Sequence, residues 1–191
     1  MKKIGITGGI GSGKSTIAKL INKLGYPVYE ADVEAKKIIL DDNKVRYQII
    51  KLLGEDAYNT EGYNRQYVAK LVFNNSALLQ GLNLIVHPAV EVHFNNWCAR
   101  NAVDGIVFQE AAILFENNSY KKFDKTILVI APEEMRIRRV MKRDGLRKEE
   151  VLARINKQWT DAKKRELADY IIQCDGEHLV VPQILKIIKE I

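Results

Sequence analysis

Eight consecutive residues near the start of the chain have the types and spacing needed to bind a polyphosphate. The stretch from Gly8 to Ser15 reads Gly-Gly-Ile-Gly-Ser-Gly-Lys-Ser and satisfies the pattern G-x-x-x-x-G-K-[ST]. Glycines allow successive backbone N–H groups to point toward a phosphate, and the N-terminus of a following helix adds partial positive charge. Lys14 supplies a full positive charge, and Ser15 is the expected protein ligand of Mg²⁺.

A glycine-rich turn and a dinucleotide-binding loop are alternative interpretations of the same residues. The second gains some support because Gly9-Ile10-Gly11 begins a G-x-G pattern and Asp32 follows after about 20 residues. However, Lys14 stands where that pattern requires its third glycine. A lysine there hinders close packing of helix against strand but suits a β- or γ-phosphate, so we favour the phosphate loop.

Two acidic residues are expected at the carboxyl ends of strands, where the ligands of open parallel sheets gather. Asp32 follows the predicted strand 27–31, and a carboxylate there is suited to take the proton of a phosphoryl acceptor hydroxyl. We favour Asp32 as general base, and its alternative role is to cap the helix that follows. Glu110 follows the predicted strand 105–109, and the residues leave open whether it contacts Mg²⁺ through water or caps the segment 111–115.

The window 136–165 holds 12 basic and 4 acidic residues, a net charge of +8 in a chain whose total is +6. Arg136, Arg139 and Arg143 recur at i, i+3 and i+7, so they line one face of a predicted helix. Arginine suits bidentate contact with phosphate and stabilises charge during phosphoryl transfer, which predicts a lid over bound nucleotide. A solvated basic face or a nucleic-acid-binding patch is the alternative.

The sequence predicts a helix-turn-helix shape for this window. Asp144-Gly145 is expected to end the first helix, and the second is expected to turn Val151, Ile155 and Trp159 inward. Glu116 lies outside this window. A glutamate of this kind is most often a surface residue at a helix end, so a functional role for Glu116 depends only on resemblance to a known family.

The hydrophobic pattern predicts the elements that position these residues. Apolar, β-branched runs predict strands at 3–7, 27–31, 105–109, 125–131 and 169–173. Between about residues 41 and 100, apolar residues recur at helical spacing and predict a helical insertion. His87 and Pro88 are expected to open one of its helices, and a lone histidine there is more often structural than a ligand. Strands alternating with helices indicate an α/β fold.

Composition and length exclude several classes of protein. A chain of 191 residues with 47% hydrophobic and 28% charged residues is expected to form one globular domain, not a disordered, collagenous or coiled-coil protein. Cys98 and Cys174 have no Cys or His beside them at metal spacing, which favours free thiols. Apolar runs fall short of the roughly 20 residues of a membrane span, and glycines interrupt the start before a signal-peptide core, so we expect a cytoplasmic protein.

Six groups of residues together resemble the dephospho-coenzyme A kinases, and the resemblance covers nearly the whole chain. They are Ile6 to Ser15, Ala31-Asp32, His87-Pro88, Ile113 to Glu116, Arg139 with Arg143-Asp144, and Ala168 to Ile172. Enzymes of that family transfer the γ-phosphate of ATP to the ribose 3′-hydroxyl of dephospho-CoA. The resemblance implies a P-loop kinase-like, three-layer α/β fold with a central parallel five-stranded sheet, a helical acceptor-binding insert and a helical lid.

The resemblance also implies how the chain is divided. Residues 1–191 are expected to form a single P-loop kinase domain. Its nucleotide-binding core is expected to comprise residues 1–40, 101–135 and 166–191. Residues 41–100 are expected to form the insert that binds the CoA acceptor, and residues 136–165 the basic lid.

Roles of individual residues follow from the same resemblance. Catalytic roles are implied for Asp32, Lys14 and Arg139. Contacts with ATP are implied for Gly11, Ser12, Gly13, Lys14, Ser15, Thr16, Arg139 and Arg143, with Ser15 on Mg²⁺. Contacts with the acceptor are implied for Asp32, His87, Arg65 and Glu110. The chain departs from the family's common pattern at Ala112, where a proline is usual, and at Glu110, where an aspartate is common.

The expected substrates are ATP and dephospho-CoA, with Mg²⁺ as cofactor, and we expect a monomer without nucleic-acid or membrane partners. Two alternatives remain. A nucleoside or nucleotide kinase of the same fold is possible because the loop and lid alone do not name the acceptor. A nucleotide-gated nucleic-acid-binding protein would use the basic window and would bind with steep salt dependence.

Overall fold

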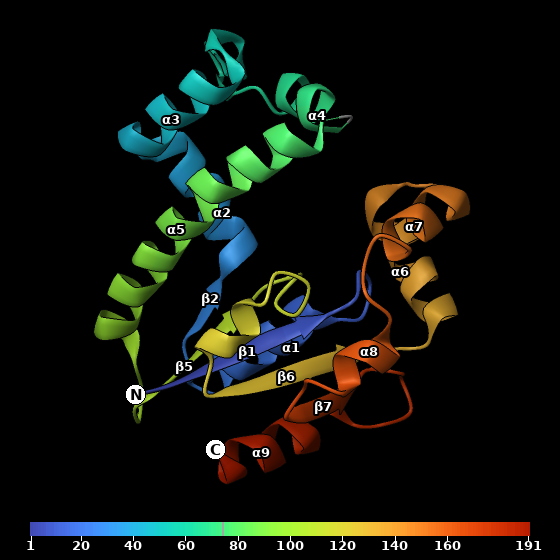
Figure 1. The fold of residues 1–191 in the computed structure, drawn as a ribbon. Coiled ribbons are helices and arrows are strands. Elements are labelled where there is room, and N and C mark those ends of the chain that lie inside the picture. The colour runs from blue at the N-terminus through green and yellow to red at the C-terminus, as the bar shows by residue number, and fades with distance from the viewer. Residues whose placement is uncertain (74) are drawn as a thin grey trace. The chain divides into compact units, whose positions relative to one another are not determined.

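The computed structural model of the chain describes residues 1–73 and 75–191. These residues form two compact units (Figure 1): a first unit made of Met1–Glu30 and Asn101–Ile191, and a second unit made of Ala31–Arg100. The sequence-based division drew its first boundary after residue 40, whereas the structure groups residues 31–40 with the second unit. Within the described ranges, no helix combines the length and apolarity needed to cross a membrane.

A five-stranded parallel sheet is the centre of the first unit, as the sequence predicts. Its strands are β1 (Lys2–Gly8), β2 (Val28–Glu30), β5 (Ile106–Glu110), β6 (Lys125–Ile130) and β7 (Tyr170–Gln173), in the order β2-β5-β1-β6-β7. Each predicted strand is confirmed to within one residue at either end. β1 and β6 are buried along most of their length, which explains why they read as continuous apolar runs rather than alternating ones.

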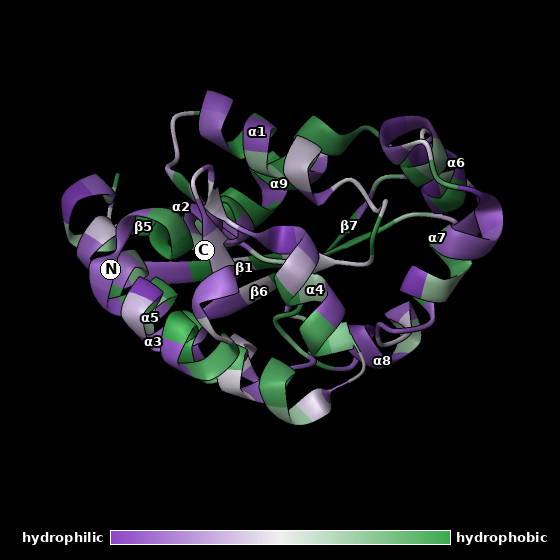
Figure 2. Cartoon of the chain, turned by 90° about the horizontal axis from the view of Figure 1, so that it is seen from above, coloured by the Kyte–Doolittle hydropathy of each residue, from purple (hydrophilic) through white to green (hydrophobic). Residues whose placement is uncertain are grey.

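Two different layers cover the faces of this sheet. Helices α1 (Lys14–Lys23) and α9 (Val180–Glu190) lie side by side on one face (Figure 2), and their isoleucines pack against Ile4 and Ile6. On the other face, the segment after β5 packs its Phe115 against Leu128. That segment continues into η2 (Ser119–Lys122), and α8 (Asp161–Arg165) contacts β6. The three-layer α/β fold is therefore confirmed.

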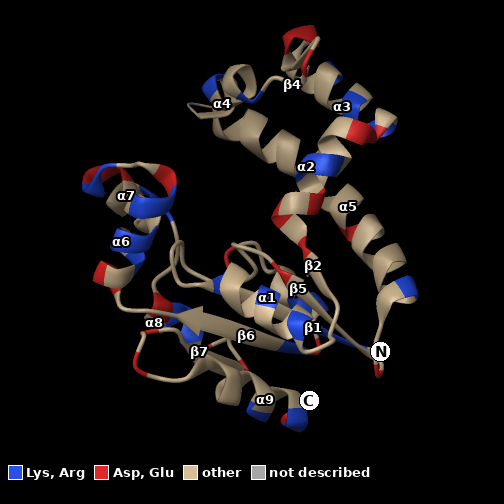
Figure 3. Ribbon diagram, turned by 180° about the vertical axis from the view of Figure 1, so that it is seen from behind, with Lys and Arg blue, Asp and Glu red and all other residues tan. Residues whose placement is uncertain are grey.

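The basic window folds as a helical hairpin, α6 (Glu133–Asp144) followed by α7 (Lys148–Ile155), and Figure 3 shows its blue Lys and Arg segments. Gly145 ends α6 with a φ of 68°, which confirms the predicted helix end. Val151 and Ile155 pack inside the hairpin as expected. The prediction for Trp159 is wrong, because this residue lies beyond the end of α7 and packs beside Phe115 on the sheet.

The second unit contains helices α2 (Ala31–Asp41), α3 (Asn43–Leu53), α4 (Arg65–Phe73) and, up to Arg100, α5 (Ser76–Asn101), together with the one-turn helix η1 (Glu55–Ala57) and strands β3 (Tyr58–Asn59) and β4 (Gly62–Tyr63). The β3–β4 hairpin was missed because its strands have only two residues each. The Asn59 side chain accepts a hydrogen bond from the Glu61 N–H within its turn. The prediction that His87-Pro88 opens a helix is wrong, because α5 runs through Pro88. A proline there removes one backbone donor without ending the helix.

Asp169 links β6 to β7 through its side chain. This contact gives a structural reason for the group Ala168 to Ile172, one of the six that resemble the dephospho-coenzyme A kinases. Its carboxylate accepts hydrogen bonds from the Thr126 N–H at 2.8 Å, the Thr126 hydroxyl at 3.0 Å and Lys125 Nζ at 2.9 Å. Burial acts to raise the pKa of Asp169, but the bonds from Lys125 and Thr126 outweigh it and the pKa is lowered. This aspartate therefore belongs to the framework and not to the site.

Candidate active site

The phosphate loop connects β1 to α1 in the first unit, in the strand–loop–helix context that its motif requires. Gly11 and Gly13 adopt positive φ values of 77° and 105°, and Gly13 stands at the N-cap of α1. A Cβ on Gly11 would lie 2.5 Å from the Arg136 carbonyl oxygen, so both the backbone conformation and the space require glycine there. The loop thereby delivers backbone N–H groups and the positive end of α1 to one place.

The side chains of the loop complete an anion-binding surface. Lys14 Nζ donates hydrogen bonds to the carbonyls of Gly8 at 2.9 Å and Gly9 at 3.4 Å, which holds the ammonium against the loop. Ser15 and Thr16 are exposed in the first turn of α1. The Ser12 hydroxyl is buried and has no hydrogen-bond partner in the described part of the chain. A polyphosphate is the ligand that these groups suit best.

Mg²⁺ fits the same place by the chemistry of its donors. This ion prefers oxygen ligands and is usually held by one or two protein groups together with the substrate's phosphates. The exposed Ser15 hydroxyl beside Lys14 offers such an oxygen. Among the residues that the structure describes, no three His, Cys, Asp or Glu side chains gather at metal-binding distance.

The three arginines predicted to line one face of α6 have different environments. Arg139 donates from its Nη1 atom to the carbonyls of Gly11 and Ser12, both at 3.3 Å, and from Nη2 to the carbonyl of Cys174 at 2.9 Å. Arg136 is buried against the phosphate loop. Arg143 is exposed and pairs with Asp144, which raises the pKa of Arg143 through their hydrogen bond.

Two glutamates lie on adjacent strands at the carboxyl edge of the sheet, as the topology requires. Glu30 of β2 and Glu110 of β5 are register partners in a parallel pair, and Ile6 of β1 is the other register partner of Glu110. Glu110 is 6% exposed. Turns at 112–118 follow Glu110, and its two predicted roles, contact with Mg²⁺ through water or capping of the segment 111–115, stay predictions.

Asp32, Arg65 and His87 belong to the second unit. Asp32 is exposed inside the first turn of α2, one residue after the helix begins, so its alternative role as N-cap of a helix from Val33 is wrong. His87 is exposed in the middle of α5. The first unit thus contains the predicted ATP-binding residues and Glu110, while the other predicted acceptor residues belong to the second unit.

Arg65 begins α4 and lines a pocket of about 230 Å³ within the second unit. Its other lining residues are Lys36, Ile39, Leu40, Glu61 and Tyr63. Burial raises the pKa of Tyr63, and the positive charge of Arg65 acts in the opposite direction. Two cations, a carboxylate and a phenol around a partly apolar wall suit a ligand with both anionic and hydrogen-bonding groups.

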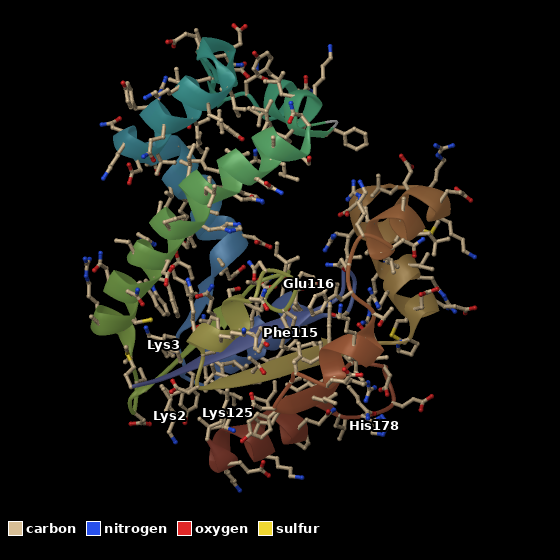
Figure 4. All side chains as sticks on the ribbon, viewed as in Figure 1. Lys2, Lys3, Phe115, Glu116, Lys125 and His178 are labelled. Carbon is tan, nitrogen blue, oxygen red and sulfur yellow. The ribbon has the colours of Figure 1, made fainter. Side chains whose placement is uncertain are left out.

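A polar cluster at the loop after β5 was missed by sequence reasoning. Glu116 Oε1 lies 2.9 Å from the fully buried Lys164 Nζ and accepts a hydrogen bond from the Trp159 N–H at 3.3 Å. Figure 4 labels Glu116 beside Phe115 on the loop after β5. The expectation that Glu116 is a surface residue at a helix end is wrong. Lys164 stands in the run Lys163-Lys164-Arg165, which gives no sign that one of the three is buried.

The chain is similar to proteins named dephospho-CoA kinase over nearly its whole length. A family model described as dephospho-CoA kinase matches residues 2–179. A dephospho-CoA kinase of Bacteroides fragilis is 38% identical over 186 residues, covering 97% of this chain and 91% of that protein. One of Staphylococcus epidermidis is 35% identical over 190 residues, covering 97% of this chain and 92% of that protein.

Solved structures agree with this result. The crystal structure of TT1252 from Thermus thermophilus matches with a TM-score of 0.88 and 37% identity, covering 99% of this chain and 96% of that chain. A dephospho-CoA kinase from Campylobacter jejuni matches with a TM-score of 0.68 and 26% identity, covering 98% and 96%. A shikimate kinase from Acinetobacter baumannii matches with a TM-score of 0.58, 17% identity and coverage of 100% and 94%, which shows a shared fold alone.

Proposed function

Because the chain belongs to the dephospho-CoA kinase family, we propose that it transfers the γ-phosphoryl group of ATP to the ribose 3′-hydroxyl of dephospho-CoA, giving CoA and ADP. One observation carries the proposal: the family match runs over residues 2–179 and so includes both the phosphate loop and the whole second unit. A shared phosphate loop alone would not distinguish this acceptor from others. The reaction is a step in the biosynthesis of coenzyme A.

The ATP side of the mechanism uses the first unit. Backbone N–H groups from Gly11 to Thr16 and the Lys14 ammonium bind the β- and γ-phosphates, because positive charge must meet the charge that spreads over the transferring group. Arg139 adds charge from the hairpin, and Arg143 is the second arginine that we assign to ATP. The Ser15 hydroxyl would hold Mg²⁺, whose charge would neutralise phosphate oxygens.

The acceptor side uses mainly the second unit. Asp32 is the general base: its exposed carboxylate accepts the proton of the 3′-hydroxyl as the oxygen attacks phosphorus. Arg65, together with Lys36, supplies two cations in the 230 Å³ pocket for the negative charge of the acceptor's diphosphate. His87 and Glu110 are the further acceptor contacts that we assign. The enzyme acts in the cytoplasm as a monomer.

A substrate comparison tests the acceptor. Purified protein is incubated with ATP and Mg²⁺ and with dephospho-CoA, adenosine, AMP or single-stranded RNA, and the phosphate position of the product is determined by NMR. We expect selective formation of CoA phosphorylated at the 3′ position. Turnover only with a nucleoside or nucleotide would refute the acceptor assignment and favour the alternative kinase, and RNA-dependent turnover alone would favour the nucleic-acid-binding protein.

The base is tested by Asp32→Asn. Loss of the carboxylate should lower kcat by about 10²- to 10⁴-fold while the KM for ATP stays within about twofold, because the phosphate loop is unchanged. Glu34→Gln is the matched control, since Glu34 lies in the same first turn of α2 but pairs with Lys37 at 2.7 Å. Full turnover by Asp32→Asn, or an equal loss in both variants, would contradict the role of Asp32.

A further inference from the structure

Ile10, at the tip of the phosphate loop, is held on three sides by residues far away in the sequence. Its backbone N–H donates a hydrogen bond to Gln158 Oε1 at 2.8 Å, and its carbonyl accepts one from Arg136 Nε at 3.0 Å. Its side chain packs against the apolar cluster of the α6–α7 hairpin, which includes Val140 and Val151. Both backbone polar groups and the side chain of one loop residue are therefore fixed from outside the loop.

The Arg136 guanidinium is seated tightly against the loop. The residue is 6% exposed, and a Cβ on Gly9 would lie 2.2 Å from its Nη2 atom. Asp161 Oδ2 pairs with its Nη1 atom at 3.4 Å, which compensates part of the buried charge. Gly9 is thus the residue that lets a charged side chain lie directly on the phosphate loop.

The residues that hold Ile10 are themselves fixed to the sheet through a bridging segment, residues 158–164. Its Trp159 N–H donates to Glu116, and its Lys164 pairs with the same carboxylate at 2.9 Å. Gln158 at its start contacts Ile10 of the phosphate loop, and Asp161 in its middle pairs with Arg136. The segment therefore links the loop after β5 to the tip of the phosphate loop.

We propose that Gln158 and Arg136 are positioning residues for ATP, which act by fixing the phosphate loop through Ile10. The proposal rests on the ATP half of the function proposed above. A loop with four glycines between residues 8 and 13 loses much conformational freedom when it binds. Fixing its tip beforehand lowers that cost and keeps the N–H groups directed at the phosphates. Neither side chain needs to touch the nucleotide.

Paired substitutions at Gln158 separate positioning from packing. Gln158→Met keeps the length of the side chain but removes the acceptor oxygen, whereas Gln158→Glu keeps an oxygen for the Ile10 N–H. We expect Gln158→Met to weaken ATP binding and raise the KM for ATP about tenfold, the equivalent of one net hydrogen bond. Its kcat and its KM for dephospho-CoA should stay within about twofold of wild type, and Gln158→Glu should restore the affinity for ATP.

Gln183 provides a matched control for general loss of stability. Its side chain makes the same kind of contact, accepting from the Gln173 N–H at 2.9 Å and donating to the Gln173 carbonyl at 3.0 Å, but it joins α9 to β7. Gln183→Met should lower thermal stability and leave ATP affinity unchanged. Arg136→Lys is the second test of the loop contact, because lysine keeps the charge but lacks the Nε atom that donates to Ile10.

The affinity for ATP is measured by calorimetry with a non-hydrolysable analogue and no acceptor, and steady-state kinetics are measured separately. If Gln158→Met and Arg136→Lys bind the analogue as tightly as wild type, the proposal is overturned. It is also overturned if Gln183→Met weakens binding equally. If the loop variants weaken binding but the wild type fails to phosphorylate dephospho-CoA, the positioning role stands and the proposed acceptor is wrong.

Discussion

Removal of the Lys164 ammonium should destabilise the first unit strongly. The side chain is 0% exposed, and its Nζ lies 2.9 Å from Glu116 Oε1, whose side chain is 14% exposed. The contact is an ion pair without hydrogen-bonding alignment, and Glu116 Oε2 also lacks a hydrogen-bond partner in the described part of the chain. Lysine is almost never fully buried unless it is paired. Lys164→Met leaves the Glu116 carboxylate without its cation and should therefore lower the free energy of unfolding.

The expected loss in the free energy of unfolding depends on the contacts that Glu116 retains. Breaking a buried ion pair on one side typically costs about 3–5 kcal/mol. We expect about 3 kcal/mol for Lys164→Met, the low end of that range, because Glu116 retains the Trp159 N–H and some solvent contact. Glu116→Leu should cost about 4 kcal/mol, since it leaves a fully buried ammonium. The double variant should cost only about 1 kcal/mol, mainly for the orphaned Trp159 N–H.

A double-mutant cycle by urea unfolding measures the coupling. Trp159 lies in the apolar cluster beside Phe115, so its fluorescence in a Trp97→Phe background reports the first unit. The midpoint and slope of each transition give the free energy of unfolding. Effects of the two single substitutions that add to within about 0.5 kcal/mol would show that the groups do not interact, and the reasoning from burial would be refuted.

Two further outcomes are expected. Cys174 should lose reactivity toward N-ethylmaleimide when ATP is bound, because its sulfur lies against the phosphate loop, 2.7 Å from where a Cβ on Gly13 would be. Labelling is followed by mass spectrometry, with buried Cys98 as the internal reference. Equal labelling rates of Cys174 with and without ATP would contradict this prediction. Asp169→Ala should lower the free energy of unfolding by about 1–2 kcal/mol at neutral pH. The folded-state pKa of Asp169 is lowered, so its contribution to stability is full above the unfolded pKa of about 4 and is lost as the pH falls below that value. Urea unfolding at several pH values should therefore show the stabilities of wild type and Asp169→Ala converging toward low pH. A difference in stability that persists unchanged into acid would exclude the carboxylate as its source.

The sequence alone determined the strands, the phosphate loop and the family resemblance, because these depend on local signals. A continuous apolar run flanked by glycines predicts a buried strand, and the loop motif requires glycines at fixed positions for its own backbone conformation. The five strands were therefore found to within one residue, and the end of α6 at Gly145 was found from its Asp-Gly pair. The role predicted for Asp32 is tested by the Asp32→Asn substitution above, and the role of Arg139 stays a prediction.

Tertiary structure alone decided which charged side chains became buried and what they hold. Lys164 and its neighbour Lys163 are identical in type, yet Lys164 is fully buried against Glu116 while Lys163 lies 3.5 Å from the centre of the Trp159 ring. Gln158 and Ile10 are 148 residues apart, and no local pattern records their contact. Such pairs depend on how the hairpin and the loop after β5 pack against the sheet, because burial and partner choice are properties of the folded chain and not of a sequence window.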